Sequence, residues 1–405
     1  MSATPKGILV CSLFLLAAFF LRSSSIPTGL SSQHLFFACC ASLIGAFTYI
    51  WFSRDLNVSI VAFLFILLTL PSLLMAEDLG TAGTRWFGWL LVMAVAGPLF
   101  CNEIRLKLKL LDWTRKLLLI CAVGSLLVNL AGIRLAGRGY FFGLMAHSMI
   151  LAPVCSLAAI DLFCSFQRRR SKWHGVLLVV CCVTCIGAGS RGAVVGLACG
   201  MLTHIVHRRE GFVVLALAVG GLIGVAQVHS ARSFETDRAD LSGGIFGELN
   251  SKGTNDTRGQ LWGFRIREFK DSPLFGVGFQ QQRLYREDSN DAFIEPGSGY
   301  LAVLSMTGTI GAIGFIAIMA TIFSSLYSKS SAIPDRYKDL LRGWMAFFAI
   351  HLVIEGYLFA CGSLLCFLFW LTVGCSVSLH HMGRQKQHQD RLADRVRRQQ
   401  MRVAA

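Results

Sequence analysis

The sequence is poor in charge. Only 15% of its 405 residues are Asp, Glu, Lys or Arg, and 54% are hydrophobic, whereas a soluble domain has about a quarter charged residues. Uncharged apolar runs of membrane length recur along the chain. The low charge therefore excludes an ordinary soluble domain and predicts an all-α, polytopic transmembrane helical bundle. The runs are continuous rather than short and alternating, which argues against a membrane β-barrel.

The sequence also lacks the motifs of several common catalytic sites. It contains no Walker motif, no zinc-binding pattern and no serine triad. Gly276-Val277-Gly278 and Gly308-Thr309-Ile310-Gly311 do not match a phosphate-binding loop, and the second lies within an apolar run, where it predicts close helix packing. Cys181, Cys182 and Cys185 lie in an apolar run without a nearby His or acid, which favours helix packing over a metal cluster.

The apolar runs predict about twelve membrane spans. Residues 174–207 could form two helices or one broken helix. The first run is followed by Arg22 and serines rather than by a small-residue cleavage site, so we interpret it as a membrane helix. The expected spans cover residues 7–21, 35–53, 58–75, 86–101, 116–133, 141–163, 174–189, 192–207, 211–228, 299–326, 340–356 and 360–379.

This division gives four parts. Residues 1–228 hold the first nine spans, 229–297 form one long water-facing loop containing short helices, 298–379 hold the last three spans, and 380–405 form a basic tail. None of the fourteen cysteines falls within 229–297, which argues against a disulfide-stapled loop domain.

Most of the 38 Lys and Arg residues fall in one set of loops, together with the tail. Basic residues mark cytoplasmic loops, so both termini are expected inside and the long loop outside. The same rule accounts for most of the net charge of +15, and no nucleic-acid partner is expected. The tail is expected to be a solvated segment that helps to fix orientation. Its alternative role is attraction to anionic inner-leaflet lipid, about 1 kcal/mol per basic residue near the surface.

Arg191 is the first candidate for a binding residue. It lies in Gly189-Ser190-Arg191-Gly192, between two apolar runs at the expected outer face. A guanidinium is costly inside a membrane, and a simple anchor would be expected on the cytoplasmic side. An arginine beside glycines suits an anion that backbone N–H groups can also approach.

Arg258 and Arg265 are the next candidates. Thr257 predicts the start of a helix, Asp271-Ser272-Pro273 predicts its end, and the two arginines fall on one face. With Trp262 beside them, they suit a membrane-surface helix that grips a lipid-linked phosphate. The alternative is an ordinary amphipathic helix whose arginines pair with Glu268 or Asp271.

The remaining candidates lie near the outer ends of spans. Arg138 and His147 flank the expected start of the sixth span, where a histidine is commonly a hydrogen-bonded packing residue. Asp291 and Glu295 precede the tenth span, and a carboxylate near an apolar boundary can serve as a base. Glu295 is nearest the membrane and is the first choice for a catalytic acid–base group.

The order of these pieces resembles the O-antigen ligase and O-antigen polymerase superfamily of bacterial inner-membrane glycosyltransferases. The resemblance extends over about residues 134–315 and includes the long outer loop. The matching pieces are Arg138 to His147, Ser190-Arg191-Gly192, Arg258 with Leu261-Trp262, Ser272-Pro273-Leu274-Phe275-Gly276-Val277-Gly278-Phe279, Tyr300-Leu301, and Gly308 with Gly311.

The resemblance implies a function. Family members transfer a glycan from undecaprenyl diphosphate at the periplasmic face, ligases to the lipid A core and polymerases to another lipid-linked glycan, without nucleotide, metal or other cofactor. It implies that Arg191, Arg258, Arg265 and Arg138 bind the diphosphate and that membrane lipid surrounds the protein. Arginine suits that task because its fork of donors can neutralise charge growing on a leaving phosphate.

The sequence departs from the family at one place. Family ligases carry a His-Asn or His-Ser pair shortly before the Tyr-Leu, interpreted as the base that activates the acceptor hydroxyl. Gly297 and Ser298 stand at those positions here. Glu295, Asp291 or His147 would then take the role, or the protein is a divergent polymerase with different demands on acceptor activation.

Two alternatives come from other classes of protein. A transporter or flippase of a lipid-linked anionic substrate should place charges near mid-membrane in broken, repeated helices. Here the unusual charges gather at the outer edge, with Glu355 at the end of the eleventh span as the main exception. A non-catalytic polysaccharide-assembly protein would fit the missing histidine, and its arginines would face lipid or solvent.

Overall fold

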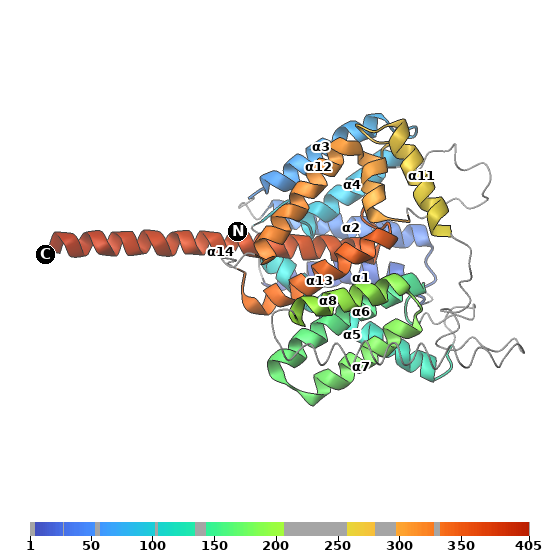
Figure 1. Cartoon of the computed structure of the whole chain (residues 1–405), viewed down its shortest axis with the longest axis horizontal. Coiled ribbons are helices and arrows are strands. Elements are labelled where there is room, and N and C mark those ends of the chain that lie inside the picture. The colour runs from blue at the N-terminus through green and yellow to red at the C-terminus, as the bar shows by residue number, and fades with distance from the viewer. Residues whose placement is uncertain are drawn as a thin grey trace, which may run out of the picture.

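The computed structural model describes residues 5–26, 28–52, 57–101, 104–133, 143–205, 257–279, 297–327 and 333–404. Over these ranges the chain is all-helical (Figure 1), with two isolated β-bridges and no strand, so the all-α part of the predicted fold class is confirmed. The helices are α1 (Pro5–Ser23), α2 (Ser32–Trp51), α3 (Ile60–Leu74), α4 (Leu79–Val95), α5 (Ile104–Leu130), α6 (Ser148–Arg169), α7 (Lys172–Gly187), α8 (Arg191–Ile205), α11 (Thr257–Asp271), α12 (Gly299–Tyr327), α13 (Asp335–Ile354) and α14 (Leu364–Ala404).

Four of the described helices are long and apolar enough to cross a membrane: Gln33–Trp51, Ser148–Arg169, Gly299–Tyr327 and Leu364–Met401. Shorter apolar helices stand beside them. Large apolar side chains also remain exposed on the outside of the bundle, as on α3 and α12, at Phe63, Leu67 and Ile316 among others. A surface of this kind indicates a membrane protein. The count of twelve spans stays a prediction, because the expected span 211–228 lies outside the described residues.

Several predicted boundaries change in the structure. The described part of residues 174–207 forms two helices, α7 and α8, separated by Ala188-Gly189-Ser190, where Gly189 has φ 72°. α4 begins seven residues before the expected span 86–101 and ends six residues before the end of that span. The last span and the described part of the tail form one continuous helix, α14, of 41 residues.

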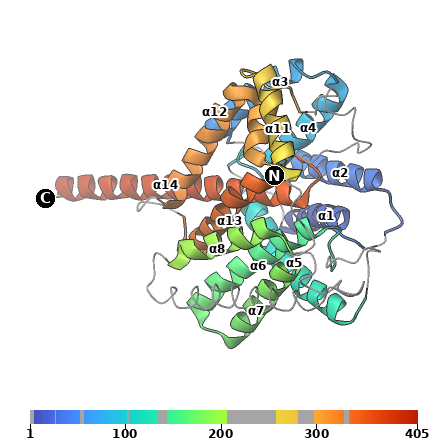
Figure 2. The same cartoon turned by 45° about the vertical axis from the view of Figure 1, so that its right-hand side comes forward.

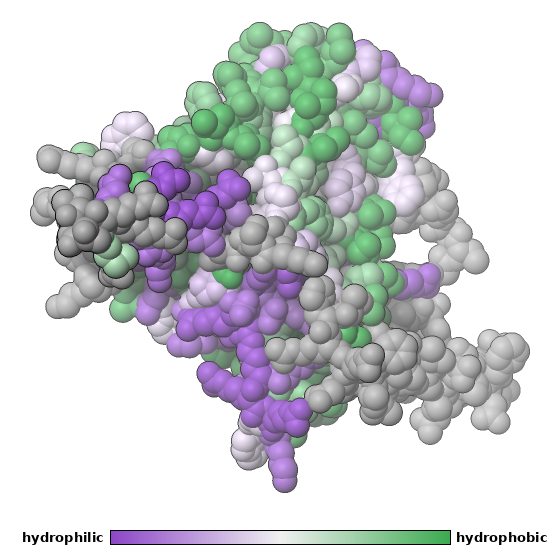
Figure 3. Space-filling view, turned by 60° about the vertical axis from the view of Figure 1, so that its left-hand side comes forward, coloured by the Kyte–Doolittle hydropathy of each residue, from purple (hydrophilic) through white to green (hydrophobic). Residues whose placement is uncertain are grey.

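The first half of α14 lies at the centre of the bundle. It contacts α1, α4, α5, α6, α12 and α13, and its second half projects from the body (Figures 1 and 2). Figure 3 views this end and shows hydrophilic residues gathered where α14 leaves, beside hydrophobic flanks. The bundle therefore has a polar end, from which α14 projects, and an opposite end.

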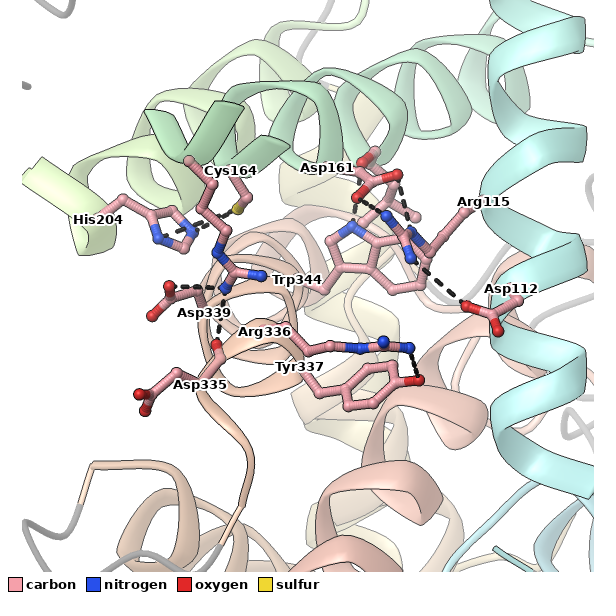
Figure 4. Close-up of polar contacts among 12 residues, drawn as sticks. Asp112, Arg115, Asp161, Cys164, His204, Asp335, Arg336, Tyr337, Asp339 and Trp344 are labelled. Atoms are coloured by element: carbon pink, nitrogen blue, oxygen red, sulfur yellow. Dashed lines mark hydrogen bonds and ion pairs between the residues drawn. The ribbon is translucent and has the colours of Figure 1, made fainter. Parts of the chain in front are cut away.

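Charged side chains at the polar end are paired with one another (Figure 4). Arg115 of α5 makes two bonds to Asp161 of α6, at 2.9 and 2.8 Å, and Arg168 of α6 lies 2.8 Å from Asp339 of α13. Pairing offsets the cost of placing these charges beside an apolar bundle. We interpret this network as structural, since it joins α5, α6 and α13.

The most extensive contact between two described helices joins α8 to α13. Gly192, Gly196 and Gly200 recur every four residues and lie along the face of α8 that meets α13. A Cβ added at Gly196 would stand 2.8 Å from the Phe347 ring, and one at Gly200 would stand 2.9 Å from the carbonyl oxygen of Gly343. Small residues let two membrane helices approach this closely.

α12 is broken at Gly308. This residue has φ 64° and ψ −170°, a conformation that is essentially restricted to glycine. The apolar run around Gly308-Thr309-Ile310-Gly311 predicted close helix packing there. That interpretation was wrong for Gly308, which interrupts the helix.

Residues 272–279 fill the break. The N–H groups of Thr309 and Ile310 donate to the carbonyl oxygens of Pro273 and Leu274, at 2.8 and 3.2 Å. On the other side of the break, the N–H groups of Val277 and Gly278 donate to Ser305 and Met306, at 2.8 and 3.1 Å. Backbone groups freed inside a membrane must find partners, and this segment supplies them. It thereby fixes the end of α11 to the middle of α12.

Gly308→Ala is expected to destabilise the protein by more than about 3 kcal/mol, because the backbone conformation disfavours any side chain. An added Cβ would also stand 2.3 Å from the carbonyl oxygen of Leu274. Thermal unfolding in detergent would measure the loss. The control is Gly263→Ala in α11, where no atom lies within 4 Å of the added Cβ. Equal stability of both variants would contradict the role of the break.

Candidate functional site

Three helix ends meet at the end of the bundle opposite the polar end. A Cβ added to Gly192, in the first turn of α8, would lie 3.0 Å from Ile354 at the end of α13. A Cβ added to Gly299, the first residue of α12, would lie 2.6 Å from Leu352 and 3.3 Å from the carbonyl oxygen of Glu355. We call this meeting of the starts of α8 and α12 with the last turn of α13 the junction.

α11 covers the start of α12 at the junction. The indole Nε1 of Trp262 donates to the carbonyl oxygen of Gly297 at 3.2 Å. Figures 1 and 2 show α11 beside the first half of α12. The predicted helix between Thr257 and Pro273 is thus present, and it lies over one of the three helix ends.

The structure gives a physical reason for the missing histidine. Gly297 has φ 72°, and an added Cβ would stand 2.8 Å from Leu261 of α11. Ser298 is buried, and its hydroxyl donates to the carbonyl oxygen of Leu352 at 3.3 Å. Both positions are used to pack α11 and α13 against α12, which leaves no room for a larger side chain.

Arg191 is the first residue of α8, and its side chain is exposed. Since α8 and α12 both begin at the junction, the positive ends of two helix dipoles lie there. The guanidinium of Arg191 adds a full charge at the same end of α8. The positive ends of α8 and α12 and the charge of Arg191 thus meet the negative end of α13 at the junction, and a role for Arg191 in binding an anion stays a prediction.

Arg265 lies in a different environment. Only 3% of it is exposed. Its NH1 donates to Glu268 Oε2 at 2.7 Å and to Ser305 Oγ at 3.4 Å. Burial lowers the pKa of Arg265, and the Glu268 carboxylate opposes that shift. The structure therefore shows the ion pair that the sequence analysis held as the alternative for this helix, and the pair joins α11 to α12.

The other predicted residues are distributed as follows. Arg138, Asp291 and Glu295 lie outside the described residues, and of Arg258 only its place in the first turn of α11 is described. His147 caps α6, where its Nδ1 accepts a hydrogen bond from the Met149 N–H at 3.0 Å. That contact is the hydrogen-bonded packing role, and no described contact joins His147 to the junction.

Two further charged residues lie near these elements. Glu355 ends α13 at the junction with 4% of its surface exposed. Arg85 of α4 donates to the carbonyl oxygen of Phe279 at 3.5 Å and contributes to lowering the pKa of Arg265. In the sequence, Glu355 stands out as an acid at the end of an expected span, but no role follows from that position. Arg85 had no local pattern to distinguish it.

Glu355 occupies an unfavourable position. An acid at a helix C-terminus opposes the helix dipole, and burying a carboxylate costs further free energy. Its helix neighbour His351 is also buried, with Nδ1 3.1 Å from the Tyr357 hydroxyl. The signal in the sequence was an acid directly after a long apolar run, which is rare and costly in membrane proteins.

Comparison with known proteins supports the resemblance. Residues 175–316 match the model of the O-antigen ligase family. The match covers α7, α8, α11, the segment that fills the break and the first half of α12. The resemblance to the O-antigen ligase and polymerase superfamily is thus confirmed over this region. No curated protein matches the sequence.

Proposed function

We propose that the protein is a glycosyltransferase that moves a glycan from undecaprenyl diphosphate to a lipid A-core or lipid-linked acceptor. The proposal rests on one observation. The matched pieces at Arg191, α11 and the start of α12 are far apart in sequence, yet all of them lie at one end of the bundle, around the last turn of α13. A shared position of this kind is expected of residues that act on one substrate.

In the proposed reaction, the acceptor hydroxyl attacks the anomeric carbon of the glycan. The bond from that carbon to the diphosphate breaks, and undecaprenyl diphosphate leaves with the bonding electrons. Arg191 and Arg258 would neutralise the charge that grows on the leaving group. Arg138 is a further diphosphate ligand in this scheme. Arg265, buried with Glu268, would position α11 rather than contact the diphosphate.

The proposed orientation follows from the basic loops. The polar end, with both termini and the projecting half of α14, would face the cytoplasm. The junction and the loop of residues 229–297, except for residues 272–279 that fill the break in α12, would face the periplasm of a bacterium, with the protein in the inner membrane. The donor glycan would then reach the site from the outer leaflet.

Transfer in a reconstituted system tests the proposal. Purified protein in liposomes would be given an undecaprenyl-diphosphate glycan together with either a lipid A-core acceptor or a second lipid-linked glycan, in the presence of EDTA. The expected result is a longer lipid-linked product and release of undecaprenyl diphosphate. Movement of the donor across the bilayer without any new glycosidic bond would instead support the transporter alternative.

The break in α12 does not by itself favour a transporter. Discontinuous helices in transporters direct backbone groups at the substrate. Here the N–H groups of Thr309 and Ile310 already donate to residues 273 and 274 of the same chain. These groups are therefore engaged within the protein.

The type of acceptor can be resolved in cells that lack the gene. If the protein is a ligase, long chains should disappear from lipid A while carrier-linked polymer accumulates. If it is a polymerase, single repeat units should remain attached to lipid A. Gel analysis of the surface glycan separates these two results.

Glu355→Gln is expected to lower the transfer rate by about 10²-fold or more, since a positioned base contributes roughly 10²–10⁴-fold. In this proposal Glu355 takes the proton of the acceptor hydroxyl. Glu355→Asp keeps the carboxylate and should retain part of the rate. The measurement is the reconstituted transfer rate at equal protein levels. If Glu355→Gln keeps the full transfer rate and Glu295→Gln loses it, the base lies on the loop of residues 229–297 instead.

A further inference from the structure

The projecting half of α14 has a regular pattern of uncharged residues. Positions 382, 389, 396 and 403 repeat every seven residues, and 385, 392 and 399 lie three residues after the first three. These seven positions hold four apolar residues and three glutamines. All nine charged residues of 382–403 fall elsewhere. The spacing is that of the a and d positions of a coiled coil.

The apolar members of this stripe are exposed where the structure describes them. Met382 is 42% exposed, Leu392 45% and Val396 51%. The helix here has left the bundle (Figure 1), and no other described helix covers it. The stripe therefore has the form of one side of a helix–helix contact.

Charge on the flanks of the stripe has one sign. The flanking e and g positions hold three basic residues, Lys386, Arg395 and Arg402, and no acid. Asp390 and Asp394 stand at b and f, on the outward side. Charged e and g residues set the choice of partner in coiled coils, so this arrangement suits a helix with glutamates at its own e and g positions.

The position of the stripe argues against lipid as the occupant. Leu379 is the last buried residue of α14. At about 1.5 Å per residue, Val396 lies roughly 25 Å farther along the helix axis. Screening limits attraction by anionic headgroups to about 8 Å at physiological ionic strength. A straight α14 therefore carries most of its basic residues beyond the reach of the membrane surface.

A second copy of the chain is also a poor fit. The first half of α14 is enclosed by six other helices. Because each helix is about 10 Å across, two copies lying side by side would keep their α14 helices roughly 30 Å apart. Helices in a coiled coil are only about 8–10 Å apart. Nucleic acid is disfavoured as well, since residues 381–404 contain no Phe, Tyr or Trp for stacking on bases.

We propose that residues 382–403 of α14 are a docking site for an acidic amphipathic helix of another protein, which packs on the uncharged stripe and pairs with Lys386 and Arg395. In the proposed orientation this partner is cytoplasmic. The site would attach a cytoplasmic protein to a membrane enzyme whose reaction takes place on the other face. The inference does not depend on the reaction, because it rests on α14 alone.

The test uses a synthetic acidic peptide of about four heptads, with leucine at a and d and glutamate at e and g. Binding to the full-length protein in nanodiscs of neutral lipid would be followed by fluorescence anisotropy. We expect binding that is lost with a peptide of the same composition in scrambled order. Val396→Asp should weaken it on the order of tenfold or more, because it places a charge in the stripe.

Met401→Asp is the matched control, because it adds the same charge at an outward position that is 66% exposed. The affinity of Met401→Asp for the acidic peptide should stay within about twofold of that of the native protein. Absence of binding, or equal losses in the two variants, would overturn the proposal. A photocrosslinker at position 396 would identify the molecule that lies against the stripe. Crosslinking to lipid or to a second copy of the chain would also overturn it.

Discussion

Arg191→Ala is expected to lower the rate of glycan transfer by roughly 10²–10³-fold, the usual effect of removing one donor that stabilises transition-state charge. The protein should still insert into the membrane at normal levels and unfold at the same temperature. Arg191 is exposed at the first position of α8, so its loss leaves no cavity in the core. The measurement is the reconstituted transfer rate at matched protein concentration.

Two variants make this result specific. Arg191→Lys keeps the charge but not the bidentate fork, and it should recover only part of the rate. Arg267→Ala removes an exposed arginine of α11 whose guanidinium lies 5.0 Å from the Phe264 ring, and it should leave the rate nearly unchanged. Normal transfer by Arg191→Ala would exclude Arg191 from diphosphate binding.

Arg265→Ala is expected to cost roughly 3–5 kcal/mol of stability, because it leaves the Glu268 carboxylate buried without its partner. Both side chains of the pair are 4% exposed. The double variant Arg265→Met/Glu268→Leu replaces the pair by apolar groups and should recover most of the loss. Thermal unfolding of the three proteins measures both effects.

Activity of the stable double variant then defines the role of Arg265. If Arg265 positions α11, as proposed, the double variant should keep a substantial part of the transfer rate. If Arg265 contacts the diphosphate directly, the double variant should be as stable as the native protein but inactive. The second result would return Arg265 to the group of diphosphate ligands that the sequence suggested.

Much of the fold follows from local patterns in the sequence. Long apolar runs predicted the helices, and the start and end signals at Thr257 and Pro273 located α11 well. The break in α12 did not follow in the same way. Gly308 resembles a packing glycine until the partners of its neighbours are known, and those partners lie in residues 273–278.

The candidate site was predictable only in part. Arg191 could be found because a cation between two apolar runs is unusual. The ion pair of Arg265 with Glu268 was one of two interpretations that the sequence left open. The burial that accompanies it comes from α12, where Ser305 lies forty residues away in the chain. Arg85 and Glu355 come from α4 and the end of α13. Their relation to α11 and α12 is set by packing between distant helices, which no local pattern encodes.

The packing of Gly297 and Ser298 explains why the histidine of family ligases is absent at these positions. The sequence shows the absence but not its cause. The close approach of Leu261 to Gly297 and the bond from Ser298 to Leu352 use these two positions for packing. A base at the junction must then come from another element. Among the described residues, Glu355 is an acid that lies at the junction, at the C-terminal end of α13.

The central claim is that the donor diphosphate binds at the junction of α8, α12 and α13. Photocrosslinking with a photoreactive undecaprenyl diphosphate, followed by peptide mapping, tests it most directly. The account predicts labels in the first turn of α8 and in α11, competed away by unlabelled undecaprenyl diphosphate and strongly reduced in Arg191→Ala. Labels confined to other helices, or unchanged in Arg191→Ala, would contradict it.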